Sequence, residues 1–155
     1  MYHFFKPEYN PNNLTGQIGG NISPTVLSGY LGELFVHDDA PPSGTDLNTY
    51  QYRKVFIKNS YGSTSLSTRV WVDALEHNEQ IALATGGALA NTTTGAVEPA
   101  GVTNWSYASN YIEGLNLGTI ANNGYTGIWI RQELTNITTP DPYATFRLVV
   151  GGLVT

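Results

Sequence analysis

Cysteine is absent from this 155-residue chain. Its absence excludes disulfide bonds, thiol chemistry and every zinc site that needs a cysteine ligand. The chain also lacks an apolar run long enough for a signal peptide or a transmembrane segment. We therefore expect a soluble protein that is made in a cytosol and has no membrane partner.

Charge is scarce, and the net charge is negative. Charged residues make up 12% of the chain and the net charge is −5, whereas an average protein carries about 25% charged residues. A nucleic-acid-binding protein needs a basic surface to neutralise phosphates. The largest group of basic residues here, Arg53, Lys54 and Lys58, falls in the segment "YRKVFIKN". We interpret this segment as a central strand with its basic residues near the strand ends or on the outer face, and we expect no nucleic-acid partner.

Helical periodicity is missing as well, because no segment of ten or more residues repeats its apolar positions with a period of 3.6. Short β-prone segments separated by Gly, Pro and Asn turns take its place. They predict seven to nine strands in an antiparallel, immunoglobulin-like β-sandwich, with a small barrel or jelly roll as the alternative. The predicted strands span residues 30–36, 50–59, 66–74, 80–84, 102–108, 115–120, 127–134 and 144–152.

Alternation within these segments predicts one shared core. Ile81 and Leu83 point together from one strand, and the Asn-Gly pair at Asn123 is a strong hairpin signal. The residues predicted to form the core are Val55, Ile57, Val70, Val72, Ile128, Ile130, Phe146 and Leu148.

We divide the chain into an extended N-terminal arm over residues 1–25 and a single β-sandwich domain over residues 26–155. A Gly-, Ala- and Thr-rich stretch around residues 85–101 is predicted to be a flexible insertion. The arm combines prolines and glycines with four aromatic anchors, so we expect it to dock on another molecule; folding back on its own domain is the alternative. The four anchors are Tyr2, Phe4, Phe5 and Tyr9.

Recognisable catalytic motifs are also lacking. None of the three histidines lies in a nucleophile frame, and no phosphate-binding loop is present. The acidic group at residues 37–39, with Asp46, lacks the ligand spacing of a calcium loop. The group at residues 73–79 is interpreted as a solvated turn. We therefore expect no catalytic residue, no metal and no cofactor.

Aromatic side chains are the remaining candidates for a functional surface. Trp71 and Trp129 alternate with inward aliphatic residues, so they should lie on the outer faces of their strands. Such residues form a sugar-binding platform, a subunit interface or the cover for a neighbouring loop. We favour the interface, because interfaces are enriched in aromatic residues. The other aromatic candidates are Trp105, Tyr107, Tyr111 and Tyr125.

The order of several segments resembles an immunoglobulin-like module of tailed-bacteriophage virion structural proteins. The resemblance covers roughly residues 19–152, and residues 85–114 depart from it. The segments that carry it are "GGNISPTVLSGYLGELF", "YRKVFIKNS", "TRVWVDA", "LGTIANNGYTGIWIRQEL" and "FRLVVGG".

The resemblance implies a non-enzymatic structural role on a virion. A small acidic β-domain with an arm is most similar to a capsid decoration, or cement, protein that binds and stabilises the outer head surface. Its expected partners are the major capsid protein and neighbouring copies of itself, as a homo-oligomer, with a trimer favoured over a dimer. Its expected location is the capsid exterior, after synthesis in the bacterial host cytoplasm. The alternatives are a head-fibre, neck or tail component, or a carbohydrate-binding module for host-surface glycans.

Overall fold

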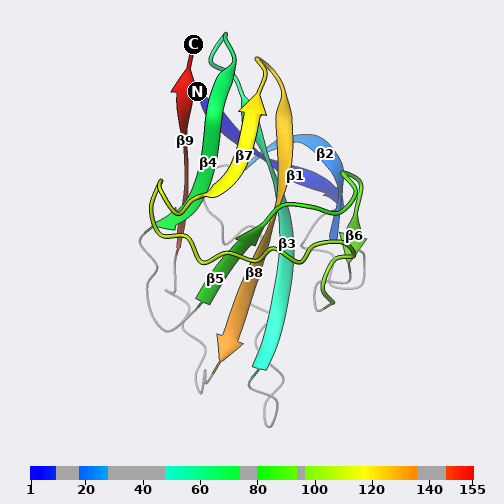
Figure 1. The fold of residues 1–155 in the computed structure, drawn as a ribbon. Coiled ribbons are helices and arrows are strands. Elements are labelled where there is room, and N and C mark those ends of the chain that lie inside the picture. Colours follow the sequence, from blue (N-terminus) through cyan, green and yellow to red (C-terminus); the bar gives the residue numbers. More distant parts are fainter. Residues whose placement is uncertain (10–17, 28–47, 74–79, 94–96, 136–145) are drawn as a thin grey trace.

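The protein is an antiparallel β-sandwich of two unequal sheets (Figure 1). The computed structural model describes residues 1–9, 18–27, 48–73, 80–93, 97–135 and 146–155. Six strands follow the order β5-β8-β3-β1-β2-β6 in one sheet, and three follow the order β7-β4-β9 in the other. The strands are β1 (Tyr2–Tyr9), β2 (Ile18–Val26), β3 (Asn48–Asn59), β4 (Ser65–Asp73), β5 (Gln80–Ala84), β6 (Thr92–Thr93), β7 (Leu115–Ile120), β8 (Tyr125–Thr135) and β9 (Arg147–Val154).

The all-β sandwich of seven to nine strands is therefore confirmed, whereas its immunoglobulin-like character stays a prediction. The predicted strand over residues 30–36 lies outside the described residues. Residues 102–108 make only an isolated bridge between Ser106 and Leu83, not a strand. Among the described residues, no helix has the length and apolarity needed to span a membrane.

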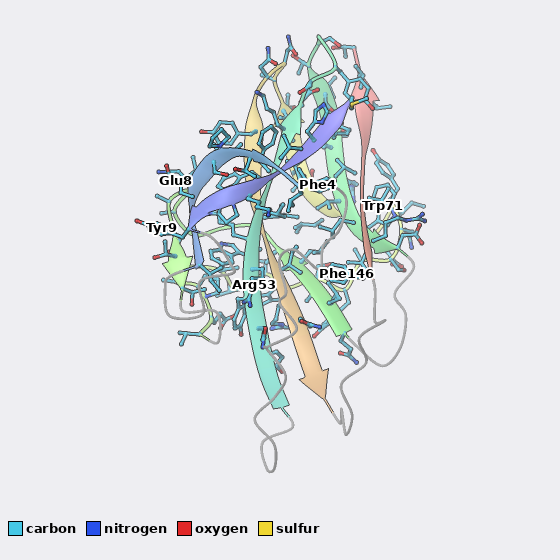
Figure 2. All side chains as sticks on the ribbon, turned by 180° about the vertical axis from the view of Figure 1, so that it is seen from behind. Phe4, Glu8, Tyr9, Arg53, Trp71 and Phe146 are labelled. Atoms are coloured by element: carbon cyan, nitrogen blue, oxygen red, sulfur yellow. The ribbon has the colours of Figure 1, made fainter. Side chains whose placement is uncertain are left out.

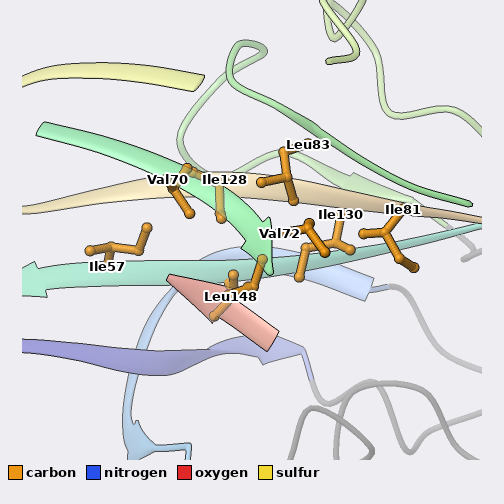
Figure 3. Close-up of a cluster of buried hydrophobic side chains, with 9 residues drawn as sticks. Ile57, Val70, Val72, Ile81, Leu83, Ile128, Ile130 and Leu148 are labelled. Carbon is orange, nitrogen blue, oxygen red and sulfur yellow. The ribbon is translucent and has the colours of Figure 1, made fainter. Parts of the chain in front are cut away.

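The core between the two sheets is the one predicted from alternation (Figure 3). Seven of the eight predicted residues are buried in one cluster, together with Ile81 and Leu83, and Phe146 is half-buried against it. Because successive strand side chains face opposite sides, the presence of Ile57 and Ile130 in this cluster fixes the register of β3 and β8. These two strands form the longest pairing of the large sheet, from Asn48 opposite Thr135 to Lys58 opposite Tyr125.

A turn at Asn123 has the conformation that the sequence indicates, but it does not close a hairpin within one sheet. Asn123 has a φ of 61°, and the Gly124 amide donates to the Ala121 carbonyl at 2.9 Å. The strands on either side, β7 and β8, belong to different sheets. The buried side chain of Asn59 holds this corner, donating to the carbonyls of Ile120 at 2.8 Å and Ser63 at 2.9 Å.

The N-terminal segment requires a correction. Residues 2–9 and 18–26 are extended, but they are strands of the domain's own sheet. β1 pairs with β3 from Tyr2 opposite Asn59 to Phe5 opposite Phe56, and it pairs with β2 on its other side. The register shifts on both sides of Pro7, which is where a strand tolerates a residue without an amide donor. The expectation that this segment docks on another molecule is replaced by its alternative, folding back on its own domain.

The predicted insertion around residues 85–101 is also tied to the domain in its described part. β6 pairs with β2, and the Gly20 amide donates to the Asn91 carbonyl at 2.8 Å. Gly87 and Gly101 are joined by a backbone hydrogen bond of 3.2 Å. This segment is therefore a cover for the outer face of the large sheet and not a free surface loop.

Candidate functional site

The outer face of the large sheet carries a group of aromatic side chains around one arginine. The register places Tyr52 opposite Arg131 and Tyr50 opposite Glu133, so alternate residues of β3 and β8 present these side chains on one face. Trp105 and Tyr107 join them because Ser106 is bonded to Leu83 of β5 by two backbone hydrogen bonds of 2.9 Å. We call this group the aromatic–arginine cluster; it consists of Tyr50, Tyr52, Trp105, Tyr107 and Arg131, with the carboxylates of Glu98 and Glu133 at its margin.

The guanidinium of Arg131 lies at the centre of the cluster. Its Cζ is 4.9 Å from the ring centroid of Tyr50, 4.8 Å from that of Trp105 and 5.8 Å from that of Tyr107. Contacts of this kind between a guanidinium and ring faces are attractive, and their strength grows with desolvation. The rings and the cation therefore hold one another in place.

Hydrogen bonds orient the polar groups of the cluster. Arg131 Nη2 donates to the Tyr107 hydroxyl at 2.8 Å, and this hydroxyl donates to Glu133 Oε2 at 3.1 Å. Trp105 Nε1 donates to Glu98 Oε1 at 2.5 Å. Burial, and next the negative charge of Glu98, raise the pKa of the Tyr52 phenol. Tyr52 is buried, whereas Tyr107 is 52% exposed, so the cluster is anchored at its base and open at its surface.

Trp129 lies on the predicted face of β8, but it is not exposed. Its exposed fraction is only 1%, because Tyr52, Ala84, Val102 and the half-buried Trp105 cover it. Trp129 cannot contribute to an interface with another molecule, and the prediction that it does is wrong. The alternative use of an outer aromatic residue, as the surface on which a neighbouring segment packs, is the one observed.

Lys54 is a buried cation that the sequence did not reveal. It lies opposite Trp129, is 2% exposed, and donates from Nζ to the carbonyls of Gly20, at 3.2 Å, and Leu89. Its Nζ is also 5.0 Å from the Phe56 ring centroid and 5.4 Å from the centroid of Trp129. Burial lowers the pKa of Lys54 to about 8. The ammonium therefore fastens the segment after β5 onto β2 and the outer face of the sheet.

Arg53 is a second buried cation, and it lies on the inner face of β3 with Val55 and Ile57. Its exposed fraction is 2%, and its Nη1 donates to the Tyr52 carbonyl at 2.9 Å. Arg53 therefore shares a face with Val55 and Ile57, as alternation along a strand requires, but it lies in the middle of β3 and not near a strand end. Lys54 lies on the outer face as expected, but its burial was not expected.

A second surface covers the outer face of the small sheet. Trp71 and Tyr111 form an edge-to-face pair with ring centroids 5.8 Å apart, and the Tyr111 hydroxyl donates to the Ser67 carbonyl at 3.1 Å. Leu66 and Leu153 lie opposite each other on β4 and β9 and are 37% and 64% exposed. Ile112 is 84% exposed. We call this surface the apolar face; it consists of Leu66, Trp71, Tyr111, Ile112 and Leu153.

The four N-terminal aromatic residues do not join either surface. Tyr2 and Phe4 pack against the core, and Phe5 lies beneath Lys58, whose Nζ is 5.7 Å from its ring centroid. Tyr9 is 48% exposed at the end of β1. Tyr9 and Trp71 lie at opposite edges of the molecule in Figure 2. The structure therefore brings none of these four interface candidates to Trp71.

The acidic groups considered from the sequence give no metal site within the described part of the chain. There, no three His, Asp or Glu side chains come together as a group that could hold a metal ion. Asp73 forms an ion pair with Arg147 across β4 and β9. The acidic group at residues 37–39, with Asp46, and residues 74–79 lie outside the described residues.

Comparisons with known proteins give no relative, because no family model, curated protein or solved structure matches the chain.

Proposed function

We propose that this chain is a non-enzymatic bacteriophage virion structural protein, a capsid decoration protein that attaches to the outer head surface. The observation that carries the proposal is the apolar face of the small sheet. It presents Leu66, Ile112 and Leu153, each more than a third exposed, together with the half-buried Trp71. A decoration protein needs a surface of this kind, because attachment to a protein lattice depends on apolar area removed from water.

The energetic scale supports attachment through this face. Complete burial of one leucine or isoleucine side chain contributes roughly 1.5–3 kcal/mol, so three such side chains contribute several kcal/mol before the cost of association. The face also carries an ordered aromatic pair, Trp71 and Tyr111, and aromatic residues are enriched at the energetic centres of interfaces. The partners that we assign to this face are the major capsid protein and neighbouring copies of the chain, with a trimer favoured.

The N-terminal segment has a different role in this proposal from the one expected from the sequence. Since β1 is the strand between β2 and β3, its residues Tyr2 and Phe4 pack against the core and stabilise the domain. Attachment then rests on rigid strands, and little chain entropy is lost when the protein binds.

The test is a binding assay with phage heads that lack the protein. Purified chain is mixed with these heads, and bound copies per head are counted by quantitative mass spectrometry. The double variant Leu66→Ser plus Leu153→Ser should bind about tenfold more weakly or worse, because two apolar anchors are lost. The matched control is Val26→Ser, which changes a residue that is 48% exposed on β2 of the other sheet.

Two results would count against the proposal. One is wild-type chain that does not bind to the heads at all. The other is a Leu66→Ser plus Leu153→Ser variant that is folded and binds as well as the Val26→Ser control.

A further inference from the structure

The aromatic–arginine cluster takes no part in the proposed attachment, because it lies on the large sheet and the apolar face lies on the small one. The first half of β3 and the last half of β8, which carry it, lie toward the end of the sandwich away from both chain termini (Figure 1). Exposed aromatic rings lower the solubility of a protein, so a group of them around polar side chains indicates a binding surface.

The chemistry of the cluster matches the two-sided character of a sugar ring. A pyranose has an apolar face of C–H groups, which packs on an aromatic ring, and a rim of hydroxyl groups, which needs planar donors and acceptors. Tyr50 and Tyr107 provide rings that are 38% and 52% exposed. The guanidinium of Arg131 donates hydrogen bonds only, and the carboxylates of Glu98 and Glu133 accept them.

The groups of the cluster hold one another in place through contacts within the chain. Arg131 is held by three rings and by the Tyr107 hydroxyl, and Glu133 accepts from the same hydroxyl. Tyr50, Arg131 and Glu133 project from adjacent paired strands and not from loops. Little side-chain entropy would therefore be lost when a ligand binds to these groups.

Charge narrows the class of ligand. The one cation of the cluster, Arg131, is accompanied by the two carboxylates of Glu98 and Glu133, so the local balance is negative. A sugar acid would meet these carboxylates, whereas a neutral sugar can use both donors and acceptors. A flat protein partner is also disfavoured, because a stable protein interface buries about 800 Å² on each side and the cluster comprises only a few side chains.

We propose that the aromatic–arginine cluster is a binding site for a neutral saccharide, with the exposed rings of Tyr50 and Tyr107 as the stacking surface and Arg131 and Glu133 as the groups that bind hydroxyls. The buried Tyr52 and the half-buried Trp105 position the rings and charged groups that contact the saccharide. The site is independent of the apolar face, so the chain has one surface for attachment and another for a glycan.

The test uses ligand-observed NMR and tryptophan fluorescence with three neutral probes, which are cellopentaose, maltopentaose and the pentamer of N-acetylglucosamine, and with oligogalacturonate as an acidic probe. The wild-type chain should bind at least one neutral probe more tightly than the acidic one. Tyr107→Ala removes a stacking ring and the bridge between Arg131 and Glu133, so it should weaken binding about tenfold or more. Tyr107→Phe keeps the ring and loses the bridge, so it should weaken binding less.

The matched control is Tyr111→Ala, because Tyr111 is also an exposed tyrosine, at 39%, but lies on the apolar face. This variant should bind the neutral probe as the wild type does. The inference is overturned if the wild type binds no neutral probe at concentrations up to about 10 mM, if it prefers the acidic probe, or if Tyr111→Ala loses as much affinity as Tyr107→Ala. Loss of head attachment by Tyr107→Ala, without any sugar binding, would assign the cluster to a protein contact and also overturn it.

Head binding and sugar binding are measured separately, so the attachment proposal and the saccharide site can fail independently.

Discussion

Raising the pH from 7 to 9 is expected to stabilise the domain, because Lys54 is buried while it carries a charge. Its ammonium contacts two backbone carbonyls and two aromatic rings, and burial lowers its pKa from 10.5 to about 8. The unfolded chain binds the proton more tightly than the folded domain does. Stability is therefore lowest below pH 8, where both states are protonated, and rises with pH between the folded and the unfolded pKa values.

The expected magnitude follows from the size of the shift. One pKa unit corresponds to about 1.4 kcal/mol, so the charged form of Lys54 destabilises the folded state by about 3 kcal/mol relative to the neutral form. Between pH 7 and pH 9 only part of this cost is removed. The free energy of unfolding should therefore rise by about 1 kcal/mol from this residue.

The assay is urea denaturation at pH 7, 8 and 9 for the wild type, for Lys54→Met and for Lys58→Met. Lys54→Met removes the titrating group, so the wild type should gain about 1 kcal/mol over this variant as the pH rises. Lys58, on the same face of β3, is half-exposed, and its variant should follow the wild type. The quantity to compare is the change in the free energy of unfolding with pH, because Lys54→Met also removes the donor to the Gly20 and Leu89 carbonyls at every pH. An equal change with pH for the wild type and Lys54→Met would refute the reasoning.

Three further predictions concern the same fold. Ile130→Ala should lower the free energy of unfolding by about 2–4 kcal/mol in urea denaturation, because Ile130 is fully buried in the core. Asn59→Ala should lower the free energy of unfolding by about 1–3 kcal/mol, because the Ile120 and Ser63 carbonyls lose the hydrogen bonds from its side chain. Asn122→Ala loses only one exposed hydrogen bond, from the Gly62 amide, so it should lower the free energy of unfolding less. Deletion of residues 1–9 should abolish cooperative unfolding by circular dichroism, because it removes the strand between β2 and β3; a deleted chain with unchanged stability would contradict the pairing of β1.

Alternation predicted the core well, because it depends only on neighbouring positions in one strand. Ile57 and Ile130 lie on the predicted inner faces. The strand β1 escaped prediction, because Pro7 interrupts its pattern and its partner, β3, is some fifty residues away in the sequence. Pairing over such a distance leaves no local signal.

The candidate site was predictable only in part, for a related reason. The sequence identified Trp105 and Tyr107 as candidate aromatic residues, but their neighbour Arg131 is brought to them by strand register and by the bridge at Ser106. The burial of Trp129 depends on cover from Val102 and Trp105, in a segment without a strand pattern. Which outer residues are exposed is therefore a property of how the connecting segments lie across the sheet.

The most direct test of the central claim is a cryo-electron microscopy reconstruction of a phage particle that carries this chain. The account predicts density for the β-sandwich on the outer head surface, in several copies, with β4 and β9 of the small sheet facing the capsid lattice and the aromatic–arginine cluster facing solvent. Particles without this density on the head, or with the chain attached through the outer face of the large sheet, would contradict the account.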